Sequence, residues 1–310
     1  MNHPAKVSVA VIVIVIIMVG IACIAYVLAR LSAPSTAVVA GNSGAGSTKI
    51  VAAENFYGDI AGQLGGSRVS VTSILSDPNI DPHEYESNVA DGIAIANANI
   101  VIENGLEYDT WIDKLISASP NASRTVITAG DIAPDPLPDN PHIWYGIDNI
   151  PTIARAITDA LEKNDPADAA YFEGNLTTFD NSLAPLTAKL AEIKANYDGM
   201  PVGLTETIYL YQTQPMGLDV LTPFNFEKAV AEGNDPSAQD VAATDNEVSQ
   251  KKIKILIYNS QTVTPIMTNL QNAAEAKGIP VVPVSETMPP NVNYQTWMMD
   301  EMNAVEAGLK

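Results

Sequence analysis

The chain has 310 residues, of which 46% are apolar and only 6% are aromatic. A chain of this length can form one large domain or two lobes of roughly 100–150 residues each. Its formal net charge of -20 argues against a nucleic-acid partner, because a phosphate backbone selects surfaces rich in Lys and Arg. The single cysteine, Cys23, excludes a disulfide framework and a thiolate metal site.

The N-terminal segment is long and apolar. Residues 7–29 lie between Lys6 and Arg30 and carry no charge. The core of a bilayer requires about 20 helical residues, whereas the apolar region of a cleavable signal peptide spans only about 7–15. We therefore predict that residues 1–31 form an uncleaved anchor in the cell membrane, with the rest of the chain outside the cytoplasm. Lipidation at Cys23, which a small residue precedes, and simple cleavage are the alternatives.

A short polar segment follows the apolar one and leads into the first folded region. Residues 32–48 are small, polar and rich in glycine, which predicts a flexible tether. From there, β-branched runs alternate with runs that have helical spacing. Such alternation predicts βαβ units and a parallel sheet, and hence an N-terminal α/β lobe over residues 49–165. Its expected strands are 49–53, 68–75, 98–104 and 124–129, and its expected helices are 55–64, 90–97 and 111–118.

The second half repeats this pattern after one long helix. Residues 166–198 form the predicted linking helix, about 45 Å long at 1.5 Å per residue, with a kink expected at Pro185. A second α/β lobe is predicted over residues 199–310. The fold class is thus α/β, with two lobes of mainly parallel sheets joined by one long rigid helix. Expected elements of the second lobe are strands 200–206, 252–258 and 278–284, and helices 264–277 and 294–309.

Histidines are rare in this chain. Of the three present, His3 precedes the membrane segment, whereas His83 and His142 each follow a proline in a polar, turn-rich stretch. Neutral imidazole is the commonest nitrogen ligand for Zn, Mn, Fe and Cu ions. A lone loop histidine is more often an ordinary surface residue, but two in similar contexts favour a metal site.

Carboxylates follow two strands of the second lobe. Glu206 ends the expected strand over 200–206, and Glu286 follows the strand over 278–284. Ligands of open α/β sheets bind outside the carboxyl ends of the strands. These carboxylates can meet the histidines only if the two sheets face each other across a cleft. A glutamate at the end of a strand is otherwise a helix cap or a solvated surface group.

Several motifs together resemble a known family. The chain from about residue 49 to residue 309 resembles the metal-specific substrate-binding proteins of ABC importers, which bind zinc or manganese in the periplasm or at the cell surface. This resemblance implies two α/β lobes joined by one long helix, with the metal in the cleft between them. The motifs that carry it are DIAGQLGG, DPHEYE, ENGLEYDTWIDKL, NPHIW, TETIYLY and VSETMPPNVNYQTW.

The resemblance also implies a set of four metal ligands. The first two histidines of the family fall on His83 and His142. The third position, histidine in many zinc binders and glutamate in many manganese binders, falls on Glu206. The fourth is normally aspartate and falls on Glu286, so this chain departs from the pattern by one methylene. The His-rich acidic loop that is common in zinc-specific members is absent.

The expected function is therefore capture and delivery, not catalysis. We expect a monomer that binds one divalent transition-metal ion and hands it to an ABC permease with its ATPase. Two imidazoles and two carboxylates favour Mn²⁺, then Zn²⁺, then Fe²⁺. The main alternative is a secreted metal-dependent hydrolase that uses the same site, although the chain has no HExxH or GxSxG motif. An adhesion protein and a carrier of another small solute are weaker alternatives.

Overall fold

The computed structural model describes residues 47–78, 80, 82 and 85–310. The predicted membrane anchor over residues 1–31, almost all of the predicted tether and the predicted ligand His83 lie outside the described residues. Within the described part of the chain, no helix combines the length and the apolar character needed to cross a membrane.

The N-terminal lobe is built on a four-stranded sheet in the order β2-β1-β3-β4, and every strand pair is parallel. Gly66, with a φ of 51°, ends the first helix in a conformation that favours glycine, as the Gly-Gly pair predicts. The strands are Thr48–Glu54 (β1), Val69–Leu75 (β2), Ile100–Glu103 (β3) and Thr125–Thr128 (β4). The helices are Asn55–Gly65 (α2), Val89–Asn97 (α3), Thr110–Ala118 (α4), Ala129–Ile132 (α5) and Ile150–Asn164 (α6), with 3-10 turns at Gly66–Arg68, Ile143–Tyr145 and Ile147–Asn149.

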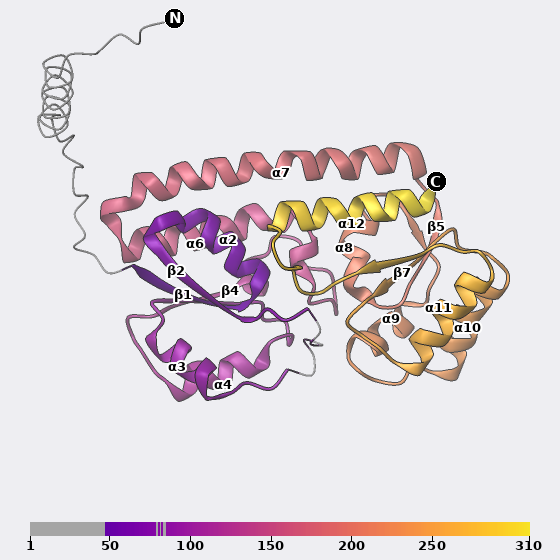
Figure 1. Cartoon of the computed structure of the whole chain (residues 1–310), viewed down its shortest axis with the longest axis horizontal. Helices are drawn as coiled ribbons and strands as arrows, with labels where there is room; N and C mark the ends of the chain where they lie inside the picture. The colour runs from indigo at the N-terminus through magenta and orange to yellow at the C-terminus, as the bar shows by residue number, and fades with distance from the viewer. Residues whose placement is uncertain (1–46, 79, 81, 83–84) are drawn as a thin grey trace, which may run out of the picture. The chain divides into compact units, whose positions relative to one another are not determined.

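Helices cover both faces of this sheet, so β1 is apolar on both sides. Ile50 and Ala52 belong to a core with α2 and α6, whereas Val51 and Ala53 belong to a second core with α3 and α4. Figure 1 shows α2 and α6 on one side of the sheet and α3 and α4 on the other. This two-sided burial explains the nearly continuous apolar run of β1, which is typical of parallel sheets.

The C-terminal lobe repeats the same strand order. Its sheet runs β6-β5-β7-β8, again with parallel pairs only. In both lobes the first strand lies inside the sheet, between the second and third strands, so the order reverses there and the carboxyl ends open a crevice. The strands are Pro201–Leu204 (β5), Asp219–Val220 (β6), Leu256–Asn259 (β7) and Val281–Val284 (β8). The helices are Leu210–Thr213 (α8), Phe224–Ala231 (α9), Ala238–Ser249 (α10), Pro265–Ala276 (α11) and Tyr294–Leu309 (α12), with a 3-10 turn at Thr207–Tyr209.

One long helix, α7, runs from one lobe to the other (Figure 1). It spans Ala169–Tyr197, 29 residues, after a 3-10 turn at Pro166–Asp168, so the predicted linking helix is confirmed. The helix continues through Pro185, which lies on its exposed face. Proline has no N–H, so one carbonyl in the preceding turn of the helix lacks its usual hydrogen bond. Because Pro185 is exposed, water can donate to that carbonyl instead.

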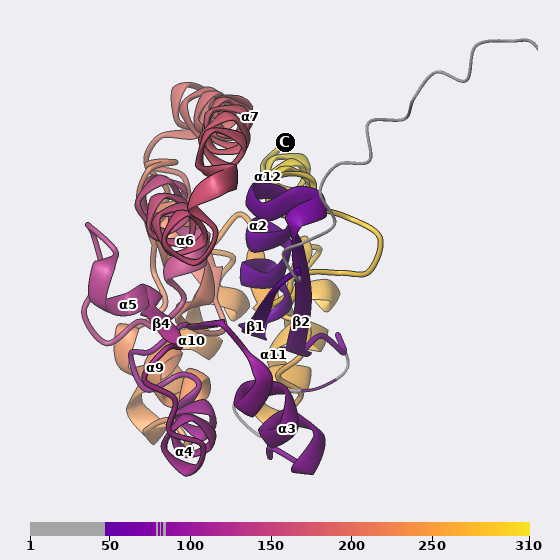
Figure 2. The same cartoon turned by 90° about the vertical axis from the view of Figure 1, so that its left-hand side faces the viewer.

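A continuous apolar core joins the lobes along α7. It extends from Ile50 in β1, through the buried leucines of α7, to Val282 in β8 and Met298 in α12. Polar contacts add to it: the Nδ2 of Asn175 in α7 donates to the Leu64 carbonyl at 2.8 Å, and Lys189 in α7 lies 2.9 Å from Glu306 in α12. Figure 2 shows α2, α6, α7 and α12 gathered on one side of the sheets.

The chain crosses between the lobes a second time after β8. Asn55, the first residue of α2, exchanges two hydrogen bonds with Met288: its Nδ2 donates to the Met288 carbonyl at 2.7 Å, and its Oδ1 accepts from the Met288 N–H at 3.0 Å. Asp59 of α2 then accepts from the N–H of Tyr294, the first residue of α12, at 2.9 Å. The segment that follows β8 is therefore held by the N-terminal lobe.

Candidate metal centre

Three of the four predicted ligands meet at one point. His142, Glu206 and Glu286 each offer a ligand atom, and these atoms all lie within 4.8 Å of one another. The three residues are 0%, 1% and 0% exposed, respectively. The fourth predicted ligand, His83, is not among the described residues. These side chains converge in a buried cluster although they are far apart in the sequence. His142 and Glu206 are separated by 64 positions, and Glu206 and Glu286 by 80.

Both lobes contribute to this cluster. Glu206 stands two residues after β5, and Glu286 stands two residues after β8, so both extend from carboxyl ends of the C-terminal sheet. His142 directly precedes the 3-10 turn Ile143–Tyr145, in the connection between β4 and α6 of the N-terminal lobe. The convergence follows the rule that ligands of open parallel sheets gather beyond the carboxyl ends of the strands.

Asn140 sets the orientation of the His142 imidazole. The Nδ2 of Asn140 donates to the Thr207 carbonyl at 2.8 Å, so its Oδ1 faces the histidine and accepts from the His142 N–H at 3.1 Å. The same Oδ1 lies 2.9 Å from Nδ1 of the ring. Because an amide oxygen can only accept, Nδ1 carries the hydrogen and the lone pair is on Nε2. Nε2 lies 3.8 Å from Oε2 of Glu286.

Aromatic rings surround the imidazole. The ring of Trp144 lies 5.2 Å from the His142 ring between centroids, and that of Tyr108 lies 5.9 Å away. Trp144 is itself stacked on Phe56 of α2, with centroids 4.4 Å apart. The histidine is therefore packed in a rigid apolar wall of the N-terminal lobe, which limits the rotamers that the ring can adopt.

Both carboxylate oxygens of Glu286 accept hydrogen bonds. The hydroxyl of Tyr108 donates to Oε2 at 2.8 Å, and the Nδ2 of Asn259, the last residue of β7, donates to Oε1 in a short hydrogen bond. Burial raises the pKa of Tyr108 well above its ordinary value, so its hydroxyl keeps the proton and remains a donor. The backbone N–H of Glu286 donates to Oε1 of Gln261 at 2.7 Å. Two hydrogen bonds thus fix the longer side chain at this position, and a third fixes its backbone.

The turn before Tyr108 has an unusual backbone. Gly105, Leu106 and Glu107 have consecutive φ angles of 73°, 54° and 66°. Asp109 stabilises this turn, because its carboxylate accepts from the Asn104 N–H at 2.6 Å and from the Gly105 N–H at 2.8 Å. Burial raises the pKa of Asp109 to about 6. Strain of this kind persists only where the surroundings enforce it, and here it brings Tyr108 to Glu286.

A cavity of about 960 Å³ opens beside the cluster, between the two lobes. Tyr108, Asn140 and Pro141 line it on the side of the N-terminal lobe, and Lys228 and Glu232 line it on the side of the C-terminal lobe. Tyr108 contacts Glu286 and Asn140 contacts His142, so two of the residues that line this cavity also contact the buried cluster.

The geometry of the cluster fits one divalent ion. Ligand atoms that each lie about 2.1 Å from an ion are at most about 4.2 Å apart, so separations of up to 4.8 Å require only a small contraction. Two carboxylates carry two negative charges, which one divalent cation balances. A neutral imidazole adds a nitrogen ligand without adding charge. The set of donors is mixed N/O and contains no sulfur.

Four residues that contact the clustered residues are not among the predicted ligands: Tyr108, Asn140, Asn259 and Gln261. Asn140 carried the clearest local signal, because an Asn side chain often bonds to the backbone two residues further on. The others are 25 to 178 positions away in sequence from Glu286, the residue they contact, so no local pattern indicates their partner.

Relatives of this chain bind different metals according to their names. The iron-binding protein YfeA of Yersinia pestis is 26% identical over 208 residues, which covers 63% of this chain and 66% of that protein. The manganese-binding lipoprotein MntA of Halalkalibacterium halodurans is 26% identical over 179 residues, covering 56% and 59% of the two chains. The chain thus spans less than two thirds of the length of these relatives.

The fold and the family are clear from two further comparisons. The structure of the periplasmic zinc-binding protein TroA of Treponema pallidum superimposes with a TM-score of 0.73 at 18% identity, covering 85% of this chain and 99% of TroA. This likeness shows the same two-lobed α/β fold with parallel sheets and a long helix. Residues 50–308 match the model of the zinc-uptake complex component A periplasmic (ZnuA) family, and the chain therefore belongs to that family.

Proposed function

We propose that this protein captures one divalent transition-metal ion outside the cytoplasm and delivers it to an ABC permease with its ATPase. The observation that carries this proposal is the buried convergence of His142, Glu206 and Glu286 from both lobes, with ligand atoms within 4.8 Å. His83 is the proposed fourth ligand. In the sequence its motif, DPHEYE, falls between β2 and α3 of the N-terminal lobe.

Electrostatics supports a cation as the cargo. Glu206 and Glu286 are fully buried, and burying two carboxylates near each other is costly unless an opposite charge is close. A divalent ion in their midst offsets this cost. Burial also removes the ion from water, so that ligands from both lobes replace its hydration shell. The ion then connects the lobes directly.

Manganese is the first choice for the cargo, zinc the second and iron the third. Carboxylates can bind through two oxygens and raise the coordination number above four, which suits Mn²⁺ or Fe²⁺ better than a tetrahedral zinc site. Zinc binds most N/O sites more tightly, so the preference for manganese is narrow. The relatives are named for iron, manganese and zinc, which supports only a small difference in preference among these three metals.

The proposed location is the outer face of the cell membrane, with attachment through the N-terminal segment. An uncleaved helix over residues 1–31 and a lipid on Cys23 are the two modes of attachment. The name of the relative MntA, a lipoprotein, supports the second mode. Mass spectrometry of the membrane-extracted protein distinguishes them, because a lipidated Cys23 would be the first residue of the mature chain.

Metal binding itself tests the proposal. Full-length protein purified without added metal is expected to contain one ion per chain by elemental analysis. Calorimetric titration of the metal-free form with Mn²⁺, Zn²⁺ and Fe²⁺ then ranks the ions. His83→Ala and His142→Ala are expected to lose tight binding, whereas His3→Ala, which removes the remaining histidine, should not. Unchanged affinity in His142→Ala would show that the site is wrong.

The hydrolase alternative gains no support. A catalytic metal needs an open coordination position that faces a substrate pocket. Within the part of the chain that the structure describes, the three clustered side chains are buried to at least 99%. The relatives are named for metal binding and not for a reaction.

A further inference from the structure

Gln261 contacts two separate segments with one side-chain amide. It follows β7 in the C-terminal lobe, and its Oε1 accepts from the N–H of Glu286 at 2.7 Å and from the N–H of Thr287 at 2.9 Å. On the other side of the amide, Nε2 donates to the carbonyl of Ile80 at 2.8 Å. Ile80 belongs to the segment that follows β2 in the N-terminal lobe.

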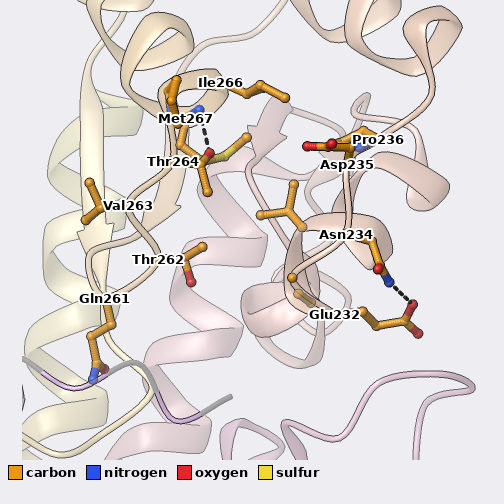
Figure 3. Close-up of a pocket in the computed structure, with 14 residues that line it drawn as sticks. Glu232, Asn234, Asp235, Pro236, Gln261, Thr262, Val263, Thr264, Ile266 and Met267 are labelled. Carbon is orange, nitrogen blue, oxygen red and sulfur yellow. Dashed lines mark hydrogen bonds between the residues drawn. The ribbon is translucent and has the colours of Figure 1, made fainter. Parts of the chain in front are cut away.

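The two segments are those that bear proposed metal ligands. Glu286 is itself a ligand in the proposed site, and Ile80 lies three residues before His83 in the sequence. A single amide therefore ties the main chain of one ligand-bearing segment to that of the other, across the two lobes. Figure 3 shows Gln261 at the border of a cavity of about 730 Å³, with its amide directed away from Val263 and toward the purple segment of the N-terminal lobe.

The chemistry of this contact requires a neutral amide of this length. The Oε1 accepts from two N–H groups while Nε2 donates to a carbonyl, and an uncharged side-chain amide supplies the acceptor and the donor on two separate atoms. Asn is shorter by one methylene. The position of Gln261 is also fixed from behind, because its own N–H donates to Oδ1 of Asn259 at 3.0 Å and Nε2 lies 3.0 Å from Oγ1 of Thr287.

We propose that Gln261 is a positioning residue that clamps the two ligand-bearing segments together and thereby slows release of the bound ion. This inference rests on the proposed function. An ion bridged by both lobes can leave only when ligands from the two sides separate, and Gln261 must give up its hydrogen bonds for that separation to occur. The clamp touches no ligand atom, so it acts on the rate of release for any metal that the site accepts.

Release of the ion into an excess of chelator tests the clamp. Full-length protein is loaded with Mn²⁺ or Zn²⁺, and the release rate is followed by stopped flow. Gln261→Met keeps the length of the side chain but removes every hydrogen bond of the amide, so release should accelerate about tenfold, as expected for losing one or two net hydrogen bonds. Val263→Ala is the matched control, because Val263 lies in the same loop with 80% of its surface exposed. Its release rate should equal that of the wild type.

Gln261→Glu separates the two halves of the clamp. Its carboxylate can still accept from the N–H groups of Glu286 and Thr287 but cannot donate to Ile80. Hydrogen exchange should therefore find these two amides protected in Gln261→Glu and unprotected in Gln261→Met, while both variants release the ion faster than the wild type. A structural defect alone would instead lower the melting temperature of the metal-free protein without this pattern.

Two results would overturn the inference, and they are distinguishable. If wild-type protein binds the metals and Gln261→Met releases them at the wild-type rate, the clamp is wrong and the proposed function stands. If wild-type protein binds none of the metals, the proposed function fails and the clamp fails with it.

Discussion

Tyr108 of the N-terminal lobe donates a hydrogen bond of 2.8 Å to Oε2 of Glu286 in the C-terminal lobe. This contact links the strained turn after β3 to the carboxylate whose extra methylene departs from the family pattern. A hydrogen bond from a fixed hydroxyl reduces the rotation of the carboxylate and orients its remaining lone pairs. In the proposed site, the longer Glu286 would thus serve where the family resemblance implies a shorter aspartate.

Removing this hydroxyl should weaken the capture of metal. Tyr108→Phe keeps the ring packing and leaves Glu286 less ordered, so the affinity for Mn²⁺ measured by calorimetry should fall about tenfold. Tyr209→Phe is the control, because Tyr209 is also buried but its hydroxyl makes no hydrogen bond among the described residues. A similar loss in both variants would contradict a specific role for Tyr108.

Asn140 should control affinity through the tautomer of His142. Asn140→Ala removes the acceptor of Nδ1–H, and metal affinity should fall by about 10–100-fold, the usual cost of losing the partner of a metal-bound histidine. Asn140→Asp keeps an acceptor at the same place and makes the ring more basic, so it should retain more of the affinity than the alanine variant. Competition against a chelator of known affinity measures both, and equal losses would argue against this role.

Metal binding should stabilise the folded state. At an ion concentration of about 100 times Kd, the gain in unfolding free energy is about 2.7 kcal/mol, which corresponds to a rise in Tm of roughly 4–5 °C for a chain of this size. Scanning calorimetry should show this rise with Mn²⁺ or Zn²⁺ and its loss after a chelator is added. Mg²⁺, which prefers oxygen ligands, is the control and should produce little shift.

Two buried glutamates of the C-terminal lobe should make the metal-free protein less stable at high pH. Burial, with the nearby charge of Glu247 as the second cause, raises the pKa of Glu227 well above its ordinary value of 4.5. Burial raises the pKa of Glu247 to about 7. A carboxyl with a raised pKa contributes stability that is complete below about 4.5 and is lost as the pH rises through the folded-state pKa. The unfolding free energy should therefore fall as the pH rises from 5 to 8.

Glu227→Met tests this explanation. Both carboxylate oxygens of Glu227 are buried without a hydrogen-bond partner in the described part of the chain, so an apolar side chain of similar size should be better tolerated. Urea unfolding should show a gain of about 1–3 kcal/mol at pH 8 and a smaller gain at pH 5. Glu275→Gln changes an exposed carboxylate of α11 and should leave the pH profile unaltered. A gain that is equal at the two pH values would refute the titration of Glu227 as its cause.

The sequence predicts the framework of this fold well, because the framework depends on local patterns. Apolar β-branched runs such as that of β1 mark buried parallel strands, and the long apolar stripe of α7 marks a helix despite Pro185. In contrast, α10 buries only Thr244, Glu247 and Val248, so its sequence has little apolar periodicity. The strand expected from residue 252 begins at Leu256, although Lys254 and Ile255 already exchange backbone hydrogen bonds with β5.

For the candidate site, the sequence predicts which residue types act as ligands and that the two glutamates stand at the ends of strands. It does not predict the residues that hold these side chains in place. Glu206 and Glu286 stand at strand ends, which a pattern can reveal. The hydrogen bonds of Asn259, Gln261 and Tyr108 depend on how the two lobes pack, and no local signal encodes that arrangement. The direction of the Asn140 amide likewise depends on Thr207, which is 67 positions away.

The ion pair between Lys189 of α7 and Glu306 of α12 has a consequence for transport. Both side chains are about nine-tenths buried, at 11% and 12% exposure, and they bind the two long helices along an apolar seam. Wide opening of the halves would have to shear this seam, so the radius of gyration from small-angle scattering should be nearly the same with and without the ion. Under the proposed function, an importer would then have to sense loading through local displacement of the peptide that carries Glu286.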